Sequence, residues 1–418
     1  MKLLFFAQQQ AWPVNNGARL RNYHLAMHLA NRCSVTFVEL RPESSKPHQV
    51  PNWPALSGVV TLPKTRTYTP LKILRGLTGP VPLTVLNCWS DNAAAKLARV
   101  LRSGSFDTIQ IEGMHLAAYL PTIRQSAGNP AIVVDWHNVE SELLWRYANL
   151  AGNWLTRSVA RRTATLVEAA ENRLLDDCGV HTVTSERERQ ILLARRPSAH
   201  IGVIPNGVDT AQFSAPGSAK ASSSTHTAVA RRSILFVGSL DYHANIDAVR
   251  WFDRTAWPEI SRIHPHLHFE IVGRRPVPEV QALASERIHV TGDVADVRPF
   301  YAAAMAVVVP IRCGSGTRLK ILEAMAAGVP VVSTPLGIEG IEAQEGAHFL
   351  SAESAQEFVA AIDFLASSPE TRRRLAGNAR ALVADHYDWS IAGEQLYRIH
   401  RNLLAAHTGR PEAVTFAF

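Results

Sequence analysis

Short apolar runs alternate with longer stretches of mixed polarity along most of the chain. A short apolar run bounded by turn residues is typical of a buried strand, and apolar positions three or four residues apart are typical of a helix. In the second half, the predicted strands are residues 234–237, 268–272, 288–290, 306–309 and 329–333, with helices near 248–263 and 297–304. Strands that are apolar throughout indicate a parallel sheet covered by helices on both faces. The second half therefore predicts a Rossmann-like α/β domain.

The first half repeats this alternation less regularly. Its predicted strands are residues 2–6, 34–40, 108–111, 131–135, 181–184 and 201–204, and a helix is expected at 21–31. Small residues with nothing to bury fill 214–224, which is typical of a linker. We therefore expect a Rossmann-like domain at 1–210, a linker at 211–232, a second such domain at 233–385, and a C-terminal helix and tail within 386–418.

A glycine-rich segment, CGSGTRLK at 313–320, follows one of the predicted strands and leads into a helix. Glycines let the backbone approach an anion, and the N-terminus of a helix offers unpaired N–H groups. Arg318 and Lys320 add formal positive charge, and Glu323 lies where a carboxylate can accept hydrogen bonds from vicinal sugar hydroxyls. Ligands of parallel sheets bind beyond the carboxyl ends of the strands, and Gly238 and Gly273 also fall there. The segment predicts a cradle for a nucleoside diphosphate, although a tight turn with solvated basic residues is the structural alternative.

This segment resembles the donor-binding signature of the family 4 retaining glycosyltransferases of the GT-B fold, and it is similar to bacterial sugar transferases of exopolysaccharide clusters. The resemblance covers most of the chain and is more specific in the second half. It implies two Rossmann-like domains facing a central cleft, with the acceptor in the first domain and the donor in the second. It also implies a final helix that returns to the first domain. The implied activity is retaining transfer of a hexose from a nucleotide sugar to a glycan or a polyprenyl-diphosphate-linked acceptor.

Two positions depart from the family pattern in the second half. Where the family commonly has an Arg and then a Lys that hold the donor diphosphate, this chain has Ser239 and the pair Ala244-Asn245. Arg318 and Lys320 are the obvious substitutes for neutralising the departing diphosphate. The first glutamate of the family motif is Ser315 here, so the resemblance leaves only Glu323 for the ribose. The expected donor-binding residues are Gly238, Ser239, Gly273, Ser315, Gly316, Thr317, Arg318, Lys320 and Glu323.

Two further candidate sites follow predicted strands of the first half. The resemblance places a loop that closes on donor and acceptor after the first strand, and its expected acceptor-binding residues are Asn16, Gly17 and Arg19. His137 follows the strand at 131–135 and is similar to the family's active-site histidine, which contacts the transferred sugar. A solvated Arg19 and a structural His137 are the alternatives. The expected catalytic residues are His137, Arg318 and Lys320.

The positive charge is concentrated in the first half. Residues 1–210 hold 23 Lys and Arg against 15 Asp and Glu, whereas residues 211–418 hold 20 against 21. A basic domain suits an acidic partner such as a diphosphate-linked acceptor or an anionic membrane surface. Arg161-Arg162, Arg195-Arg196 and the stretch 71–77 are candidates for membrane docking. No basic stripe with interleaved aromatic residues appears, so we expect no nucleic-acid partner.

Cysteine and histidine usage argues against a metal cofactor. The chain has four scattered cysteines without a CxxC pair, which fits a reducing cytoplasm. The histidines at 264–268 are more simply explained by a strand edge than by a metal site. The apolar N-terminus is interpreted as a first strand, and no apolar segment reaches the roughly 20 residues that span a bilayer. We expect no cofactor, and a cytoplasmic protein that attaches peripherally to the inner face of the plasma membrane.

Other functions remain open. A nucleotide-sugar epimerase has the same architecture and would use cleft carboxylates for elimination and re-addition. A non-catalytic nucleotide-sugar-binding relative would retain the sheets while losing the Arg/Lys pair and the first glutamate. The absence of an obvious carboxylate pair and the close match of the cradle favour the transferase.

Overall fold

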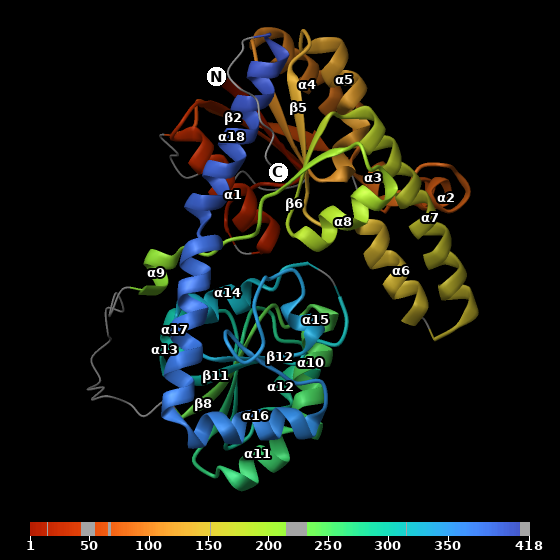
Figure 1. The fold of residues 1–418 in the computed structure, drawn as a ribbon. Coiled ribbons are helices and arrows are strands. Elements are labelled where there is room, and N and C mark those ends of the chain that lie inside the picture. Colours follow the sequence, from red (N-terminus) through yellow and green to blue (C-terminus); the bar gives the residue numbers. More distant parts are fainter. Residues whose placement is uncertain are drawn as a thin grey trace. The chain divides into compact units, whose positions relative to one another are not determined.

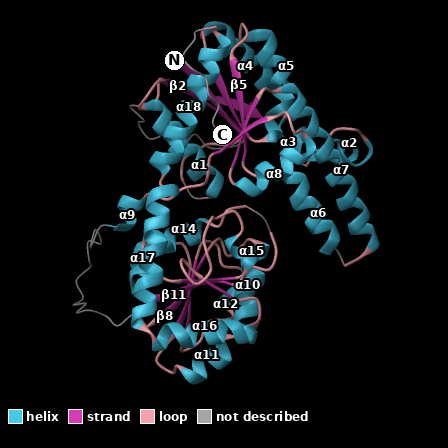
Figure 2. Ribbon diagram, in the orientation of Figure 1, coloured by secondary structure: helices cyan, strands magenta, loops and turns pink. Residues whose placement is uncertain are grey.

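The computed structural model describes residues 1–14, 16–42, 55–65, 68–150, 152–214, 232–314 and 316–409. They form two compact units (Figure 1). Unit 1 comprises Met1–Asn206 together with the chain from Trp389 onward, and unit 2 comprises Gly207–Asp388. In each unit helices lie on both sides of a parallel sheet (Figure 2). The predicted α/β class with two Rossmann-like domains is confirmed.

Unit 1 is built on a seven-stranded parallel sheet of order β3-β2-β1-β4-β5-β6-β7. Its strands are β1 (Lys2–Ala7), β2 (Ser34–Pro42), β3 (Gly58–Lys64), β4 (Thr108–Glu112), β5 (Ala131–Trp136), β6 (Val180–Val183) and β7 (His200–Val203). The interior strand β1 is buried from Leu3 to Ala7 because its side chains meet helices on both faces. Strand β3 was not predicted, since its Pro and Gly weaken the strand pattern and are tolerated only at a sheet edge.

Helices cover both faces of this sheet. They are α1 (Gly17–Ala30), α2 (Pro70–Thr78), α3 (Leu83–Cys88), α4 (Asp91–Ser103), α5 (Leu120–Ser126), α6 (Glu140–Leu150), α7 (Trp154–Asp177), α8 (Glu186–Arg195) and the C-terminal α18 (Trp389–His407), with a 3-10 helix at Met114–Tyr119. Helix α7 packs alongside α6 (Figure 1). None of the described helices is both long and apolar enough to cross a bilayer.

Helix α18 packs on α1 at the end of the chain. A Cβ atom on Gly393 would lie 2.2 Å from Cγ of His28, so the absence of a side chain permits this close approach. The Trp389 indole stacks on the His24 ring with 4.9 Å between ring centroids. Trp389 and Leu396 complete the apolar core between α1 and the sheet. The last helix of the sequence is thus part of the first folded unit.

Unit 2 has a six-stranded parallel sheet of order β10-β9-β8-β11-β12-β13. Its strands are β8 (Ser233–Val237), β9 (His268–Val272), β10 (Ile288–Thr291), β11 (Ala304–Val309), β12 (Val331–Ser333) and β13 (Leu350–Ser351). Its helices are α9 (Thr210–Ser214), α10 (His243–Thr255), α11 (Trp257–Ile263), α12 (Pro278–Gln281), α13 (Arg298–Ala303), α14 (Leu319–Ala326), α15 (Pro335–Ile338), α16 (Ala355–Ser367) and α17 (Pro369–His386). Every residue of β11 is buried, which places the glycine-rich segment directly after the apolar core.

Two predicted elements of unit 2 differ in the structure. The helix expected at 248–263 is two helices, α10 and α11, because Pro258 lacks the N–H that a continuous helix would require. Residues 211–214 of the expected linker belong to α9, which is held by a 2.6 Å hydrogen bond from Thr210 Oγ1 to Asp388 Oδ2. Residues 215–231 of that linker lie outside the described part of the chain.

Candidate active-site residues in the two units

Two glycines, Gly238 and Gly273, allow the loops after β8 and β9 to approach each other closely, because neither has a side chain. A Cβ on Gly273 would lie 1.6 Å from the carbonyl oxygen of Gly238, so no side chain fits there. A Cβ on Gly238 would lie 2.7 Å from Asn245 Nδ2 and 2.9 Å from Lys320 Nζ. Asn245 Nδ2 donates to the Ser239 carbonyl at 2.8 Å. The loop after β8, the start of α10 and the side chain of Lys320 therefore meet at the carboxyl edge of the sheet.

Lys320 is a buried cation in this cluster, with 9% of its surface exposed. Its Nζ donates to Asn245 Oδ1 at 2.9 Å and lies 3.9 Å from the centroid of the Phe236 ring. Among the described residues no carboxylate lies within ion-pair distance of Nζ. Burial, followed by the charge of Arg318, lowers the pKa of Lys320 to about 7, and Glu323 only partly opposes this. The described part of the site thus holds a buried lysine that forms no ion pair and whose charge Glu323 compensates only in part.

Arg318 lies at the N-cap of α14, beside the glycine turn. Its Nη1 donates to the Gly316 carbonyl at 3.0 Å, and a Cβ on Gly314 would lie 3.3 Å from its Nη2. Gly314 and Gly316 have φ angles of 101° and 83°, a region that side chains disfavour. Thr317 Oγ1 is buried without a hydrogen-bond partner among the described residues. Ser315 lies outside the described residues.

Glu323 lies one turn into α14 and is held by a tyrosine from α13. The Tyr301 hydroxyl donates to Glu323 Oε2 at 2.8 Å. The pKa of Glu323 is raised, because the effect of burial outweighs the Tyr301 hydrogen bond and the Lys320 charge, which both lower it. The structure therefore brings Lys320, Arg318 and Glu323 to one edge of the sheet in unit 2, with Asn245 and Tyr301 as supports that the sequence analysis did not identify.

In unit 1, His137 lies just beyond the carboxyl end of β5. Its Nε2 lies 2.7 Å from Glu112 Oε2 and 3.5 Å from Asp135 Oδ2. Burial lowers the pKa of His137, but the hydrogen bond to Glu112 and the charges of Glu112 and Asp135 outweigh it and raise the pKa. His137 thus favours the protonated form more than an exposed imidazole does.

Arg21 of α1 forms a buried bidentate ion pair with Asp135. Arg21 Nε donates to Oδ2 at 2.9 Å and Nη2 to Oδ1 at 2.7 Å. Thr182 Oγ1 adds a 2.6 Å hydrogen bond to Oδ1 of the same carboxylate. Asp135 carries a lowered pKa because the charge and hydrogen bonds of Arg21 outweigh the effect of burial. The ion pair fixes the first turns of α1 against the carboxyl edge of the sheet.

Glu112 at the end of β4 is the centre of a second set of buried hydrogen bonds. Gln110 Nε2 donates to Oε1 at 2.9 Å, and His400 of α18 lies 2.8 Å from Gln110 Oε1 through its Nε2. The Asn22 amide, oriented with its nitrogen toward the carboxylate, donates to Oε2 at 2.8 Å. Burial and the Asp135 charge raise the pKa of Glu112. A chain of hydrogen bonds thus connects the C-terminal helix to His137.

Glu112 and Asp135 form a carboxylate pair that the sequence analysis did not find. Both are fully buried, and with His137 their ligand atoms lie within 4.8 Å of one another, close enough to hold a metal ion. The guanidinium of Arg21 already neutralises Asp135, so a cation would have to displace it. Protein groups therefore already supply hydrogen bonds and charge partners to both carboxylates.

The predicted loop residues of unit 1 cap α1. Asn16 Oδ1 accepts from the Arg19 backbone N–H at 2.9 Å, and Gly17 begins the helix. Arg19 Nη1 donates to the Pro13 carbonyl at 3.4 Å. Because α1 also carries Arg21 and Asn22, this loop and His137 lie at the same edge of the sheet.

Two segments of the chain match known glycosyltransferase families. Residues 15–212 match Glycosyltransferase Family 4, and residues 231–368 match Glycosyl transferases group 1. Together the two matches cover most of the chain, and the chain belongs to the glycosyltransferases of these families. The resemblance that the glycine-rich segment suggested is confirmed for both halves of this glycosyltransferase.

Solved structures share the fold of this glycosyltransferase. Sucrose-phosphate synthase from Thermosynechococcus elongatus is 18% identical, with a TM-score of 0.69 over 97% of this chain and 100% of that chain. HepE from Anabaena, in complex with UDP and glucose, is 16% identical, with a TM-score of 0.66 over 96% of this chain and 99% of that chain. An uncharacterized 44.6 kDa protein in the cps region of Klebsiella pneumoniae is 24% identical over 164 residues. That match spans 37% of this chain and 42% of the length of the Klebsiella protein.

Proposed function

We propose that this protein is a retaining glycosyltransferase that moves a hexose from a nucleoside-diphosphate sugar to a glycan or a polyprenyl-diphosphate-linked acceptor. The observation that carries the proposal is Lys320, a buried lysine beside Arg318 and the N-terminus of α14 that forms no ion pair with any described carboxylate. A charged lysine in such a place is stabilised when an anion arrives. The nucleotide in the HepE complex and the cps-region relative support this substrate class and a role in cell-surface or exopolysaccharide synthesis.

In this proposal unit 2 binds the donor. Lys320 and Arg318 neutralise the diphosphate as it departs, and the developing charge is what such cations stabilise most. Glu323, positioned by Tyr301, accepts hydrogen bonds from the ribose hydroxyls. Gly238, Ser239, Gly273, Gly316 and Thr317 line the approach of the phosphates, and Ser315 remains a donor-binding candidate from the sequence alone. No metal ion is required in this scheme because protein cations neutralise the leaving group.

Unit 1 binds the acceptor. Nε2 of His137 is engaged by Glu112, so in this proposal the other ring nitrogen, Nδ1, contacts the transferred sugar. Asn16, Gly17 and Arg19 border the acceptor. Retention follows when the acceptor hydroxyl attacks the anomeric carbon on the face from which the diphosphate leaves. A bond forms from the hydroxyl oxygen to that carbon, the bond to the phosphate oxygen breaks, and the hydroxyl proton passes to the departing phosphate.

As for location, we propose a cytoplasmic protein attached to the inner face of the plasma membrane, where polyprenyl-linked acceptors are exposed. We propose no nucleic-acid partner.

The test is thermal stabilisation of the full chain by a panel of UDP-, GDP-, ADP- and dTDP-sugars. We expect one nucleotide class to raise the melting temperature, and Arg318→Ala and Glu323→Ala to abolish the shift. Arg262→Ala is the matched control, because Arg262 is an exposed arginine of the same unit that pairs with Glu259. No shift with any nucleotide sugar would contradict the proposal, and a shift without transfer to any acceptor would favour a non-catalytic binding protein.

The buried carboxylate pair keeps one alternative in view. Glu112 and Asp135 are the kind of groups that an epimerase would use for elimination and re-addition. Incubation of the selected donor without acceptor distinguishes the two enzymes, because an epimerase converts the sugar to its epimer and a transferase does not. The anomeric configuration of the product, determined by NMR, tests retention.

A further inference from the structure

Helix α2 has an apolar stripe that the described residues of unit 1 leave exposed. None of its residues is buried. Leu71 and Leu74 are 56% and 58% exposed, and Leu77, three positions further on, is also exposed. Residues spaced by three lie on one side of a helix. Several exposed leucines in a short surface helix are uncommon in a soluble protein and mark an interaction surface.

The first turns of α7 continue this apolar surface. Trp154 is 76% exposed, and Leu155 and Val159 are exposed as well. Leu155, Val159 and Arg162 are spaced by four and three residues and therefore share a side of α7. Arg162 Nε and Nη2 donate to the carbonyls of Leu77 and Gly79 at 2.6 and 3.1 Å, just at the end of α2. The exposed apolar residues of α2 and those of α7 thus lie next to each other.

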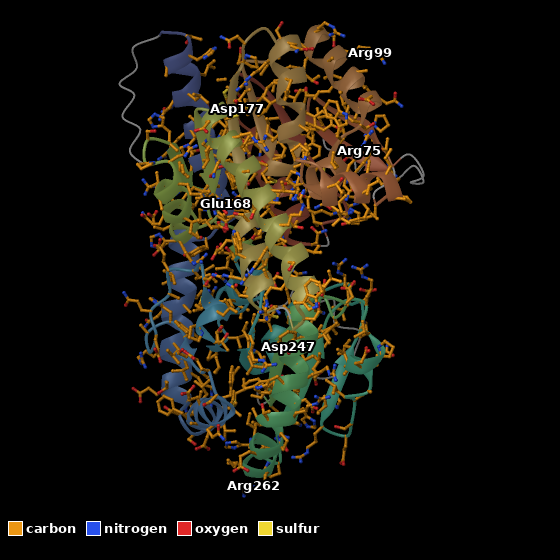
Figure 3. The ribbon with its side chains drawn as sticks, turned by 90° about the vertical axis from the view of Figure 1, so that its right-hand side faces the viewer. Arg75, Arg99, Glu168, Asp177, Asp247 and Arg262 are labelled. Atoms are coloured by element: carbon orange, nitrogen blue, oxygen red, sulfur yellow. The ribbon has the colours of Figure 1, made fainter. Side chains whose placement is uncertain are left out.

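The same surface is basic. Lys72 and Arg75 lie in α2, and Arg157, Arg161 and Arg162 lie in the first half of α7. No Asp or Glu occurs in 68–79 or in 152–167. Figure 3 views unit 1 from the side that carries α2 and α7, and it labels Arg75 on α2. The basic-apolar face is defined by Leu71, Leu74, Arg75 and Leu77 of α2 and by Trp154, Leu155, Val159 and Arg161 of α7.

The other pair of basic residues that the sequence suggested for docking is engaged within the protein. Arg195 Nη1 pairs with the buried Glu171 at 2.7 Å, and Arg196 pairs with Asp176 at 2.6 Å. Their charges are neutralised where they lie. The basic-apolar face differs because it combines cations with exposed leucine and tryptophan side chains.

We propose that the basic-apolar face docks on the surface of an anionic phospholipid bilayer. Leu71, Leu74 and Trp154 enter the boundary between headgroups and acyl chains. Arg75 and Arg161 bind the lipid phosphates. A second copy of this chain is disfavoured as the occupant, because a symmetric contact would bring identical arginines together. The purpose of docking rests on the proposed function. Docking would hold unit 1 at the membrane surface that carries a lipid-linked acceptor.

The test is cosedimentation of the full chain, without donor, with vesicles of equal parts phosphatidylglycerol and phosphatidylcholine. Vesicles of phosphatidylcholine alone are the reference. We expect binding to the anionic vesicles that weakens with salt. The double variant Leu71→Ser/Leu74→Ser should lower the partition coefficient about tenfold, and Arg75→Glu should lower it about fivefold or more.

Two matched variants serve as controls. Arg99→Glu reverses an exposed arginine on α4, labelled in Figure 3 outside the face, and Phe364→Ser removes an exposed aromatic ring of unit 2. Both should bind vesicles like the wild type. All the substituted side chains are exposed, so the melting temperatures should agree.

Several outcomes would overturn the proposal. These are no binding to anionic vesicles, equal binding to phosphatidylcholine alone, or equal losses in the controls. If the wild type self-associates in analytical ultracentrifugation and Leu71→Ser/Leu74→Ser abolishes it, the face is a contact between copies. The donor-induced thermal shift of the double variant should match the wild type, so failure of docking and failure of donor binding are separable.

Discussion

The two candidate sites treat buried charge in opposite ways. In unit 1, Arg21, Asp135, Glu112 and His137 neutralise one another, and their remaining hydrogen bonds go to other protein groups. In unit 2, Lys320 is buried with an amide and an aromatic ring as its partners. A self-satisfied network holds groups in fixed positions, whereas a cation without an anion is prepared to bind one. The comparison suggests that unit 1 contributes geometry and unit 2 contributes electrostatic binding.

The largest expected effect is on stability. Replacing Arg21 with Met leaves Asp135 buried without its cation, and we expect the free energy of unfolding to fall by about 3–5 kcal/mol. Lys320→Met removes a buried charge that forms no ion pair with the described carboxylates, so we expect unchanged or greater stability. Urea denaturation of the two variants measures this contrast. Similar losses in both would contradict the distinction between the sites.

The second effect concerns donor binding. Lys320→Met should raise the Kd for the nucleoside diphosphate selected in the donor panel by roughly 10- to 100-fold, because a hydrogen bond to a charged group is lost. Arg312→Met is the matched control, since Arg312 is exposed and pairs with Asp247. An unchanged Kd in Lys320→Met would remove Lys320 from the site.

Binding should also take up a proton. The pKa of Lys320 is lowered to about 7 in the free protein, so above that pH much of the side chain is neutral. A bound diphosphate stabilises the charged form and raises this pKa, which means that proton uptake accompanies binding above pH 7 and disappears well below it. Calorimetry in buffers of different ionisation enthalpy measures the uptake, and Lys320→Met should abolish it.

A third effect is the pH dependence of stability in unit 1. Burial lowers the pKa of His400 to about 3, whereas an unfolded histidine titrates near about 6.5. The unfolded state therefore binds the proton first, and stability is lost as the pH falls from about 6.5 toward 3. His400→Gln replaces the imidazole with a non-titrating amide that can donate to Gln110 Oε1, and it should reduce this loss. The raised pKa of His137 acts with the opposite sign, because its contribution is lost as the pH rises through that raised value.

The smallest effect concerns the support of Glu323. Tyr301→Phe removes the hydroxyl that donates to Oε2, and we expect donor affinity to fall about fivefold with the fold retained. If the affinity of Tyr301→Phe equals that of the wild type while Glu323→Ala loses binding, Tyr301 does not position the carboxylate.

The sequence predicted which residues lie together in unit 2 better than in unit 1, for a physical reason. The cradle is local, because Arg318, Lys320 and Glu323 lie within one turn and one helix, where residue spacing determines which side chains are neighbours. The network of unit 1 joins residues that are 114 positions apart for Arg21 and Asp135, and 290 apart for Gln110 and His400. Periodicity carries no information about such pairs. Asn245 and Tyr301 were missed for the same reason, since each reaches α14 from another element.

The order of synthesis gives the packing of α18 on α1 a further consequence. The ribosome makes the sheet of unit 1 first and the helix that completes its core last, with the whole of unit 2 in between. Leu25 and Leu29 of α1 therefore lack part of their apolar cover until translation reaches the final helix. A nascent chain released before that point would carry a finished second unit and an unfinished first one.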